Sequence, residues 1–347
     1  NVSLDAPGAD ESDARVSQET STDANPRKTR SDPSVQTQEN VCGGCGEPVP
    51  DEHVYCPNCG EKQSHRAFCE CGDEVRTDTD GSIDAKAIVS SVEAAEEIAQ
   101  DGDTVVVAGG TYEESVTVDT ANLTIEGAGA DATTIDSSSG ATIKINGADG
   151  VSISGLELDG SGSSNGGAQG ISIQNGGSAT VTNTDITNAF GGIQTLSDES
   201  SVTVDNVEVT NSVFGVGLQS SSSDVVRNST FDVSTQGIGM SGDAANVEIT
   251  GNEIDVEESE STTFDQERGI DFAADGENVT IENNVISSTD TGIISNTGLD
   301  NVTISGNDIA GDLTHIDDSA EALDLNAIFE DNAFTDGSSV EGNQIVP

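Results

Sequence analysis

The sequence predicts an all-β protein whose main part is a parallel β-helix, a solenoid of stacked coils. A pattern of apolar residues returns every 18 to 32 residues through the last two thirds of the chain, which is about the length of one coil. In each repeat, apolar residues stand at a zero position and two and seven places later, and a Gly-Ile pair follows, as in Val279, Ile281, Ile286 and Gly292-Ile293. Aromatic residues are only 3% of the chain, which favours short strands and turns over helix bundles.

The repeat predicts about ten coils, whose inward apolar residues stack into columns. We expect the Gly of each Gly-Ile pair to occupy a corner that needs a positive φ. Five places after zero, Asn recurs in the last coils and is expected to hydrogen-bond from coil to coil, as Asn252, Asn284, Asn307 and Asn332. The zero positions are Val105, Leu123, Val151, Ala179, Val202, Asp224, Val247, Val279, Val302 and Ala327.

The charge balance excludes some partners. The 347 residues include 64 Asp and Glu against 11 Lys and Arg, so that the formal net charge is −53, and nucleic acid and anionic membrane surfaces would be repelled. This composition resembles the surfaces of proteins from extreme halophiles. No run is apolar enough to span a membrane. The chain begins at Asn1 rather than Met, so we leave localisation open: cytoplasmic if zinc is bound, cell surface or secreted if a leader was removed.

The first 75 residues predict two segments. Residues 1–40 are polar and lack apolar periodicity, which predicts a disordered tail. Residues 41–75 resemble a zinc ribbon, because two Cys-x-x-Cys pairs have the spacing of two knuckles around one structural Zn²⁺. The predicted ligands are Cys42 and Cys45 in the first knuckle and Cys56 and Cys59 in the second. The alternative is a set of disulfides in a secreted chain.

The remaining cysteines, Cys69 and Cys71, depart from the knuckle spacing. Three assignments are possible for this pair: a second zinc site with His53 and His65, two free thiols or a disulfide.

Residues 76–82 are predicted to be a linker, and the solenoid to run from 83 to 347. Ser90-Ser91-Val92-Glu93 predicts a capping box that opens a helix ending near Asp101-Gly102, with an apolar stripe of Val92, Ala95, Ile98 and Ala99. The helix, then Asp103-Thr-Val, Gly110-Thr-Tyr and Asn122-Leu-Thr-Ile, resembles the helical cap and first coil of the pectin-lyase-like right-handed β-helices, including the nitrous-oxide-accessory and carbohydrate-binding types. That resemblance implies a right-handed solenoid.

Two coils are long, and their extra residues enter between the seventh position and the Gly-Ile pair. Residues 159–169 and 255–268 should therefore protrude from one edge, four coils and roughly 19 Å apart. They are either the walls of a trough long enough for a few sugar units or unconstrained surface insertions. The expected ligand-binding residues of the trough are Phe190, Phe214, Phe264, Arg268 and Gln194.

Outward carboxylates supply candidate chemistry. Asp185 and Glu208 should lie on adjacent rungs as acid and base, with Asp205 and Arg227 as electrostatic partners. They also make a calcium ion on the acidic outer face possible. Hydrolases of the resembled fold use an Asn-Thr-Asp element, which Asn183-Thr184-Asp185 matches, but their paired aspartates, Gly-His-Gly and Arg-x-Lys elements are missing.

Three functions remain open. The first is a non-catalytic protein that recognises carbohydrate or another cell-surface ligand along its lateral face, with a zinc ribbon able to dock a protein partner. The second is a polysaccharide-active enzyme, that is, a glycoside hydrolase, lyase or epimerase. The third is a structural or adhesive component of a surface or a virion.

The zinc assignment predicts a metal content. Reduced full-length protein should hold close to one Zn²⁺ per chain, and the double variant Cys42→Ser/Cys56→Ser should hold none, because the two ligands that remain, Cys45 and Cys59, cannot retain the ion. Elemental analysis measures the metal. Zinc-free protein with two disulfides in its intact mass would instead identify an oxidised, secreted chain.

Overall fold

The computed structural model describes only part of the chain. The tail apart from Val2–Leu4, all six cysteines, the linker, Phe264 and Ala327 lie outside the described residues, as do most of the two long insertions. The chain divides into two compact units, and the described residues belong to the unit formed by Asn1–Pro7 and Lys86–Pro347. The described residues are 2–4, 88–89, 91–137, 140–160, 168–219, 223–242, 244–257, 267–273, 276–295, 299–311, 314–318 and 331–334.

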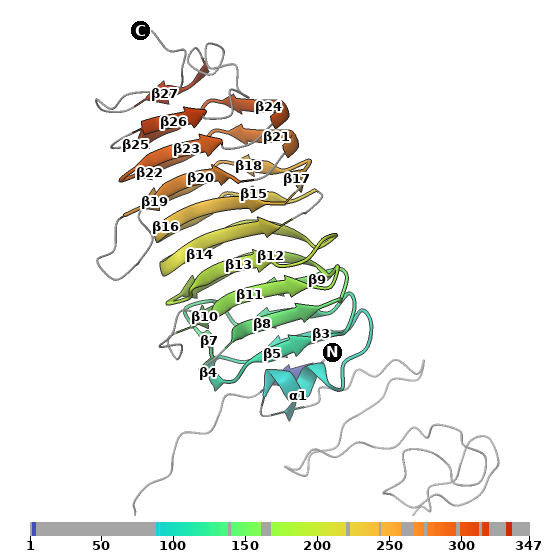
Figure 1. Cartoon of the computed structure of the whole chain (residues 1–347). Helices are drawn as coiled ribbons and strands as arrows, with labels where there is room; N and C mark the ends of the chain where they lie inside the picture. Colours follow the sequence, from blue (N-terminus) through green and yellow to red (C-terminus); the bar gives the residue numbers. More distant parts are fainter. Residues whose placement is uncertain are drawn as a thin grey trace, which may run out of the picture. The chain divides into compact units, whose positions relative to one another are not determined.

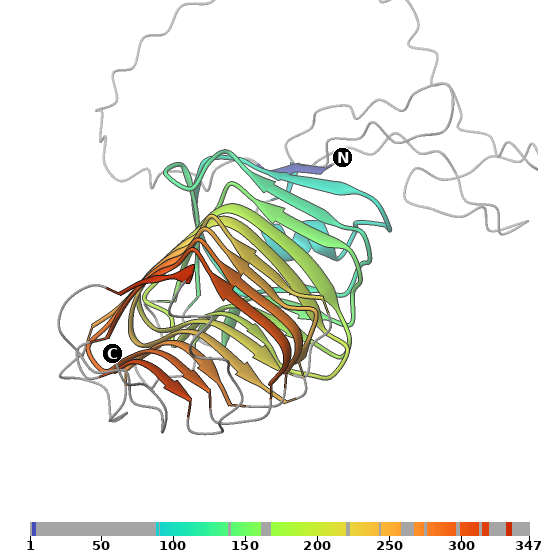
Figure 2. The ribbon, with the colours of Figure 1, turned by 90° about the horizontal axis from the view of Figure 1, so that it is seen from above.

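The described strands coil into a parallel β-solenoid with three lateral sheets, here named A, B and C in the order in which each turn passes through them. Figure 1 shows the turns stacked along one axis with sheet C facing the viewer, and Figure 2 shows the sheets around the core seen along that axis. Three long strands pass from one sheet into the next: β12 (Ser178–Thr187) and β14 (Ser201–Gln219) begin in sheet A, and β16 (Thr230–Ser241) runs from B into C.

The other strands each belong to one sheet or lie at its end. Sheet A contains β3 (Thr104–Val107), β6 (Thr124–Gly127), β9 (Val151–Ser154), β15 (Val225–Arg227), β18 (Glu248–Thr250), β21 (Gly276–Glu282) and β24 (Leu299–Ser305). Sheet B contains β4 (Gly110–Glu113), β7 (Thr133–Asp136), β10 (Glu157–Asp159), β19 (Glu253–Val256), β22 (Val285–Ser288), β25 (Asp308–Gly311) and β27 (Ala333–Phe334). Sheet C contains β5 (Val116–Val118), β8 (Ala141–Asn146), β11 (Gln169–Gln174), β13 (Gly191–Thr195), β20 (Arg268–Phe272), β23 (Thr291–Ser295) and β26 (Thr314–Asp318). Three strands are short: β1 (Val2–Leu4) pairs with β3, β2 (Ile88–Val89) pairs with β1, and β17 (Ala244–Ala245) pairs with β21.

The predicted apolar columns are confirmed. The seventh-position residues stand in register from Leu158 to Phe334, and all of them from Leu158 to Ile309 are buried. The predicted coil number is too high, because the described residues form about eight turns. The first zero position was also wrong: Val105 pairs with Ile125, two places after Leu123, so that the first coil is offset by two residues.

The glycines of the Gly-Ile pairs are required for a different reason from the predicted positive φ. None of Gly170, Gly192, Gly215, Gly237 and Gly269 has a positive φ. Instead, a Cβ on each would lie 2.3–2.7 Å from the carbonyl oxygen of the glycine one turn later. The backbones approach too closely there for any side chain, and this steric limit explains the column.

Amide side chains form ladders that connect successive turns. The predicted ladder is confirmed: the buried Nδ2 groups of Asn252, Asn284 and Asn307 each donate to the Oδ1 of the next Asn, at 2.8–2.9 Å. Further ladders lie on the exposed corners and point the opposite way, toward the N-terminus. Several of them end on an aspartate: Asn175 to Asn146 to Asp119, Asn122 to Asp101, Asn188 to Asp159 and Asn228 to Asp205.

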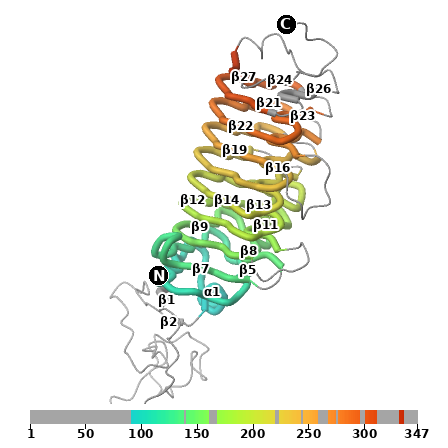
Figure 3. Tube along the Cα trace, turned by 90° about the vertical axis from the view of Figure 1, so that its left-hand side faces the viewer, coloured from blue at the N-terminus to red at the C-terminus, as the bar shows by residue number. Residues whose placement is uncertain are grey.

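The helix is shorter than predicted. Helix α1 (Val92–Glu96) lies at the N-terminal end of the solenoid, as Figure 3 shows, and Ser91 rather than Ser90 is its N-cap. The side chain of Glu93 does not close a capping box but accepts a hydrogen bond from the backbone of Thr117 in β5. Ile98, expected in the apolar stripe, is 54% exposed, because the helix ends before it. None of the described helices is long and apolar enough to cross a membrane.

The buried ladder predicts a stability difference. Asn284→Ala removes bonds to Asn252, Asn307 and the Ile249 carbonyl and leaves buried polar groups unpaired, so that the free energy of unfolding should fall by roughly 3 kcal/mol. The control Asn146→Ala breaks a ladder in which water replaces the lost partners, and should lose less than about 1 kcal/mol. Urea denaturation measures both. Equal losses would show that burial of the ladder does not matter.

Candidate functional site

The outer face of sheet C differs from the rest of the surface because it lacks carboxylates over five successive strands. Strands β8, β11 and β13 contain no Asp or Glu, and neither do the parts of β14 and β16 that belong to sheet C, residues 212–219 and 235–241. Asp271 in β20 is the first carboxylate further along. On sheet B, by contrast, Glu157, Asp185 and Glu208 stand on neighbouring strands.

A column of polar and glycine residues runs along the middle of this face. We call it the polar column; its members pair in register from strand to strand. Their neighbours in sequence, such as Ile171 and Ile193, fill the core, so that alternation directs the members of the column outward. The polar column consists of Lys144, Ser172, Gln194, Gly217 and Gly239.

The two glycines of the column form a flat floor on which amide side chains lie. A Cβ on Gly217 would be 2.2 Å from Oε1 of Gln194, and one on Gly239 would be 2.3 Å from Oε1 of Gln236. Glycine is therefore required for these side chains to lie flat. Gly217, Gly239 and Gln236 were not predicted from the sequence, although the alternation Gly-Val-Gly at 215–217 and Gly-Ile-Gly at 237–239 marks an outward glycine two places after the stacked one.

Gln194 has an unsatisfied amide. Its Nε2 atom is buried and has no hydrogen-bond partner among the described residues. Gln236, in the equivalent surroundings, donates from Nε2 to Oδ2 of Asp271 at 2.9 Å. An orphaned donor costs about 1–3 kcal/mol, so that Gln194 would gain from an acceptor that the described residues do not provide.

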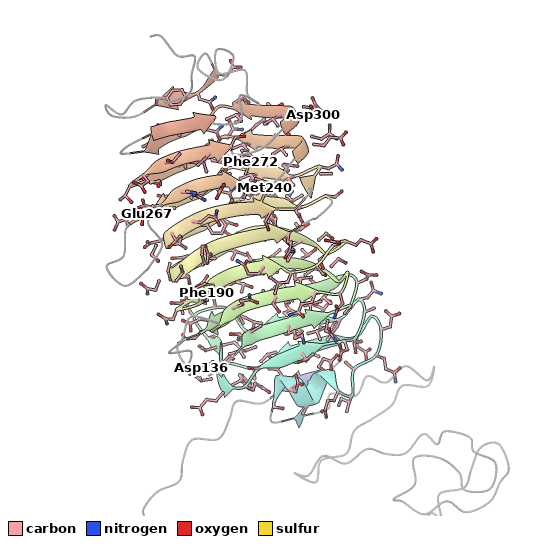
Figure 4. All side chains as sticks on the ribbon, viewed as in Figure 1. Asp136, Phe190, Met240, Glu267, Phe272 and Asp300 are labelled. Atoms are coloured by element: carbon pink, nitrogen blue, oxygen red, sulfur yellow. The ribbon has the colours of Figure 1, made fainter. Side chains whose placement is uncertain are left out.

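An aromatic pair borders the polar column. Phe190, in the corner before β13, and Phe214, in β14, are half-buried and meet edge to face with ring centroids 5.1 Å apart. Figure 4 places Phe190 at the edge of sheet C that adjoins sheet B. Gly191 follows Phe190 and pairs with Phe214, and a Cβ on it would be 2.8 Å from Nε2 of Gln194. The structure therefore places Gln194 close to both rings, and the expected role of these residues in ligand binding stays a prediction.

Arg268 lies further along the same sheet, two strands beyond Phe214. Its guanidinium pairs with Asp271, whose side chain is only 3% exposed, so that the Arg268 charge is already balanced. Phe264 and most of both long insertions lie outside the described residues, and the trough stays a prediction. Its place is nevertheless consistent with the strands, because both insertions connect sheet B to sheet C.

The second candidate region is an acidic hollow of about 500 Å³ at the corner between sheets A and B. Asp185 and Glu208 pair in register on β12 and β14, as predicted, and both line it. The opposite wall is the loop 128–132, which adds Asp131. Asp131 was not predicted from the sequence. The sequence does contain a signal for the longer loop, because ten residues separate Ile125 from Ile135, whereas five separate the equivalent Ile153 and Leu158.

The environment of the hollow affects the ionisation of Asp185. Partial burial, followed by the negative charges of Glu208, Asp131 and Glu157, raises the pKa of Asp185 above its usual value. Asp205 and Arg227 do not line the hollow; they form an exposed ion pair at 3.0 Å on sheet A. The hydrogen bond from Asn228, together with Arg227, lowers the pKa of Asp205.

The predicted metal sites stay predictions. None of the cysteines on which they rest belongs to the described residues, neither the four predicted zinc ligands nor the pair of the second site: Cys42, Cys45, Cys56 and Cys59, then Cys69 and Cys71. Among the residues that are described, no three His, Cys, Asp or Glu side chains come close enough to hold an ion together. The zinc ribbon and the calcium ion on the acidic face therefore remain to be tested by metal analysis.

Comparison with known proteins places the fold. The family described as the right handed beta helix region matches residues 108–254 and 141–309, which together span more than half of the chain. Pectate lyase Pel9A has a TM-score of 0.50 at 13% identity, over 75% of this chain and 73% of the lyase. The A-module of mannuronan C-5 epimerase AlgE6 from Azotobacter vinelandii has a TM-score of 0.40 at 16% identity, over 66% and 76%. At these identities the likeness concerns the fold alone.

A short segment resembles a different kind of protein. Over 38 residues, 11% of this chain, it is 53% identical to the transcriptional regulator CdrL of Halobacterium salinarum. The chain spans only 22% of the length of that curated relative.

The repeat, the stacked columns and the family match together show that the chain belongs to the right-handed β-helix family.

Proposed function

We propose that this chain binds carbohydrate along the outer face of sheet C and does not transform it. The observation that carries the proposal is the absence of carboxylates from five strands of one face in a chain with a net charge of −53. A surface under no other constraint would carry acidic residues on sheet C as it does on sheet B. Their absence leaves a surface on which a ligand can lie without desolvating carboxylates.

The side chains of this face suit sugar hydroxyl groups. Gln194 and Gln174 offer amide groups, which both donate and accept hydrogen bonds as sugar hydroxyls do. The rings of Phe190 and Phe214 provide an apolar surface for the C–H face of a sugar. Five strands at about 4.8 Å spacing extend over roughly 19 Å, enough for a few sugar units.

The flat floor favours an extended ligand. Gly217 and Gly239 carry no side chain that would interrupt the face between Gln194 and Asp271. A chain of sugars can therefore lie parallel to the solenoid axis and meet one strand after another. The unsatisfied Nε2 of Gln194 becomes available when its side chain turns outward from Gly191 toward a ligand oxygen.

A second function is supported by the acidic hollow. Asp185 and Glu208, a pair on adjacent strands, would act in glycoside hydrolysis as acid and base, and the raised pKa of Asp185 suits the acid. The hollow has no aromatic residue to hold a sugar among the described residues that line it. We therefore rank this function second.

Binding on sheet C is tested with a glycan array and titrations of the best ligand. Gln194→Ala should weaken the affinity about fivefold and Phe214→Ala about tenfold, because each removes one contact of the proposed face. The control Gln100→Ala, an exposed glutamine outside sheet C, should change nothing. Full affinity in both face variants would place the ligand elsewhere, and absence of any glycan ligand would contradict the function.

The hollow predicts a dependence of stability on pH. Because the folded-state pKa of Asp185 is raised, the folded chain binds this proton more tightly than the unfolded chain, and the ionised carboxylate destabilises the fold at neutral pH. Asp185→Asn should raise Tm at pH 7 by about one degree, since solvent screens a partly exposed group. The difference from wild type should shrink as the pH falls through the raised pKa of Asp185.

The same variant separates the two functions. If the hollow is catalytic, Asp185→Asn and Glu208→Gln abolish product formation from polysaccharides. If the chain only binds, both variants leave the glycan affinity of sheet C unchanged and wild type forms no product. A Tm of Asp185→Asn equal to wild type at every pH would contradict the assigned electrostatics.

A further inference from the structure

The polar column ends in an unpaired positive charge. The described basic side chains are those of Lys144, Arg227 and Arg268. Arg227 pairs with Asp205, and Arg268 pairs with Asp271. Lys144 alone makes no ion pair within the part of the chain that the structure describes.

None of the described carboxylates forms an ion pair with Lys144. Its partners in register are Thr117 on β5 and Ser172 on β11, and the Ser172 hydroxyl accepts a hydrogen bond from Gln174. The carboxylate of Glu93 reaches the β5 strand, but the backbone nitrogen of Thr117 binds it at 2.6 Å.

Lys144 and Gln194 are two donors of one column that lack an acceptor among the described residues. They lie two strands apart, about 10 Å at the usual strand spacing, with Ser172 between them. The opposite end of the face carries Asp271, whose carboxylate is already bonded to Arg268 and Gln236. The face is thus positive at one end and has a balanced ion pair at the other.

We infer that Lys144 selects glycans that carry a single anionic group, a carboxylate or a sulfate, and fixes the direction in which they lie. This inference rests on the proposed function. The anionic group binds the Lys144 ammonium, the next sugars lie over Ser172 and Gln194, and a later sugar meets the Phe190–Phe214 pair. Lys144 is a specificity-determining residue in this arrangement.

A polyanion fits the same face poorly. Beyond Lys144, the column offers only neutral groups as far as Gly239, so that further anionic groups would find no cation. The net charge of −53 would repel each of them. One anion at one end is the pattern that the charges of the face match.

The test uses three matched xylo-oligosaccharides: the neutral hexamer, the hexamer with one glucuronic acid branch and the hexamer with one sulfate. Wild type should bind at least one charged member about five- to tenfold more tightly than the neutral one, as expected for one charge-assisted contact. Lys144→Gln should remove this preference, so that the charged and neutral hexamers bind the variant with equal affinity. Which charged member is preferred distinguishes carboxylate from sulfate.

The control Arg227→Gln removes the same charge from sheet A and should keep the preference. Raising the salt from 0.1 M to 1 M shortens the Debye length from about 10 Å to about 3 Å and should reduce the wild-type preference for the charged hexamers. Lys144→Gln should show no preference at either salt concentration. A preference that survives Lys144→Gln, or wild type that binds the neutral hexamer and prefers neither charged member, overturns the inference while the proposed function stands. Failure of all three hexamers and of every array glycan overturns the proposed function itself.

Discussion

The structure depends on one constraint: each turn must present its backbone hydrogen-bonding groups in register with those of the next. All the strand pairs described are parallel, and an aliphatic column under each sheet fills the interior. Because side chains at equivalent positions stack directly, a side chain that does not fit at one position disturbs the equivalent side chains in the turns before and after it. The glycines before Ile171, Ile193 and Ile238 show how tight the stacking becomes, since the next backbone occupies the place of a side chain.

This constraint explains what could be predicted from the sequence. A column needs the same kind of residue once per turn. The register of Ile186, Val209 and Ile254 can therefore be predicted from the sequence alone. The buried Asn ladder was found for the same reason. The pairing of Asp185 with Glu208 and of Asp205 with Arg227 followed directly from it.

Features that do not repeat once per turn were predicted less well. The number of turns was overestimated, and the first coil was offset, because Val105 resembles a zero position in isolation. The helix is shorter than expected, and Glu93 accepts a hydrogen bond from the backbone of β5 instead of capping its own helix. The position of Asp131 in the hollow was not predicted, because its neighbours there come from strands far along the chain. The five strands of sheet C that lack carboxylates are separated along the chain by segments of sheets A and B, so that this difference between faces depends on the fold.

The ladders on the exposed corners have a direction, and this limits how the solenoid can grow. The amides donate toward the N-terminus, and in several of these ladders an aspartate such as Asp119 or Asp159 receives the last bond. An ionised carboxylate accepts but cannot donate, so that a turn inserted before it would find no donor to continue the ladder. A turn inserted after it, between Asn146 and Asn175 for example, finds both a donor and an acceptor. Duplication of turns is therefore compatible with these corners on the C-terminal side of the aspartates, and each aspartate marks a fixed end from which a longer protein of this kind can be extended.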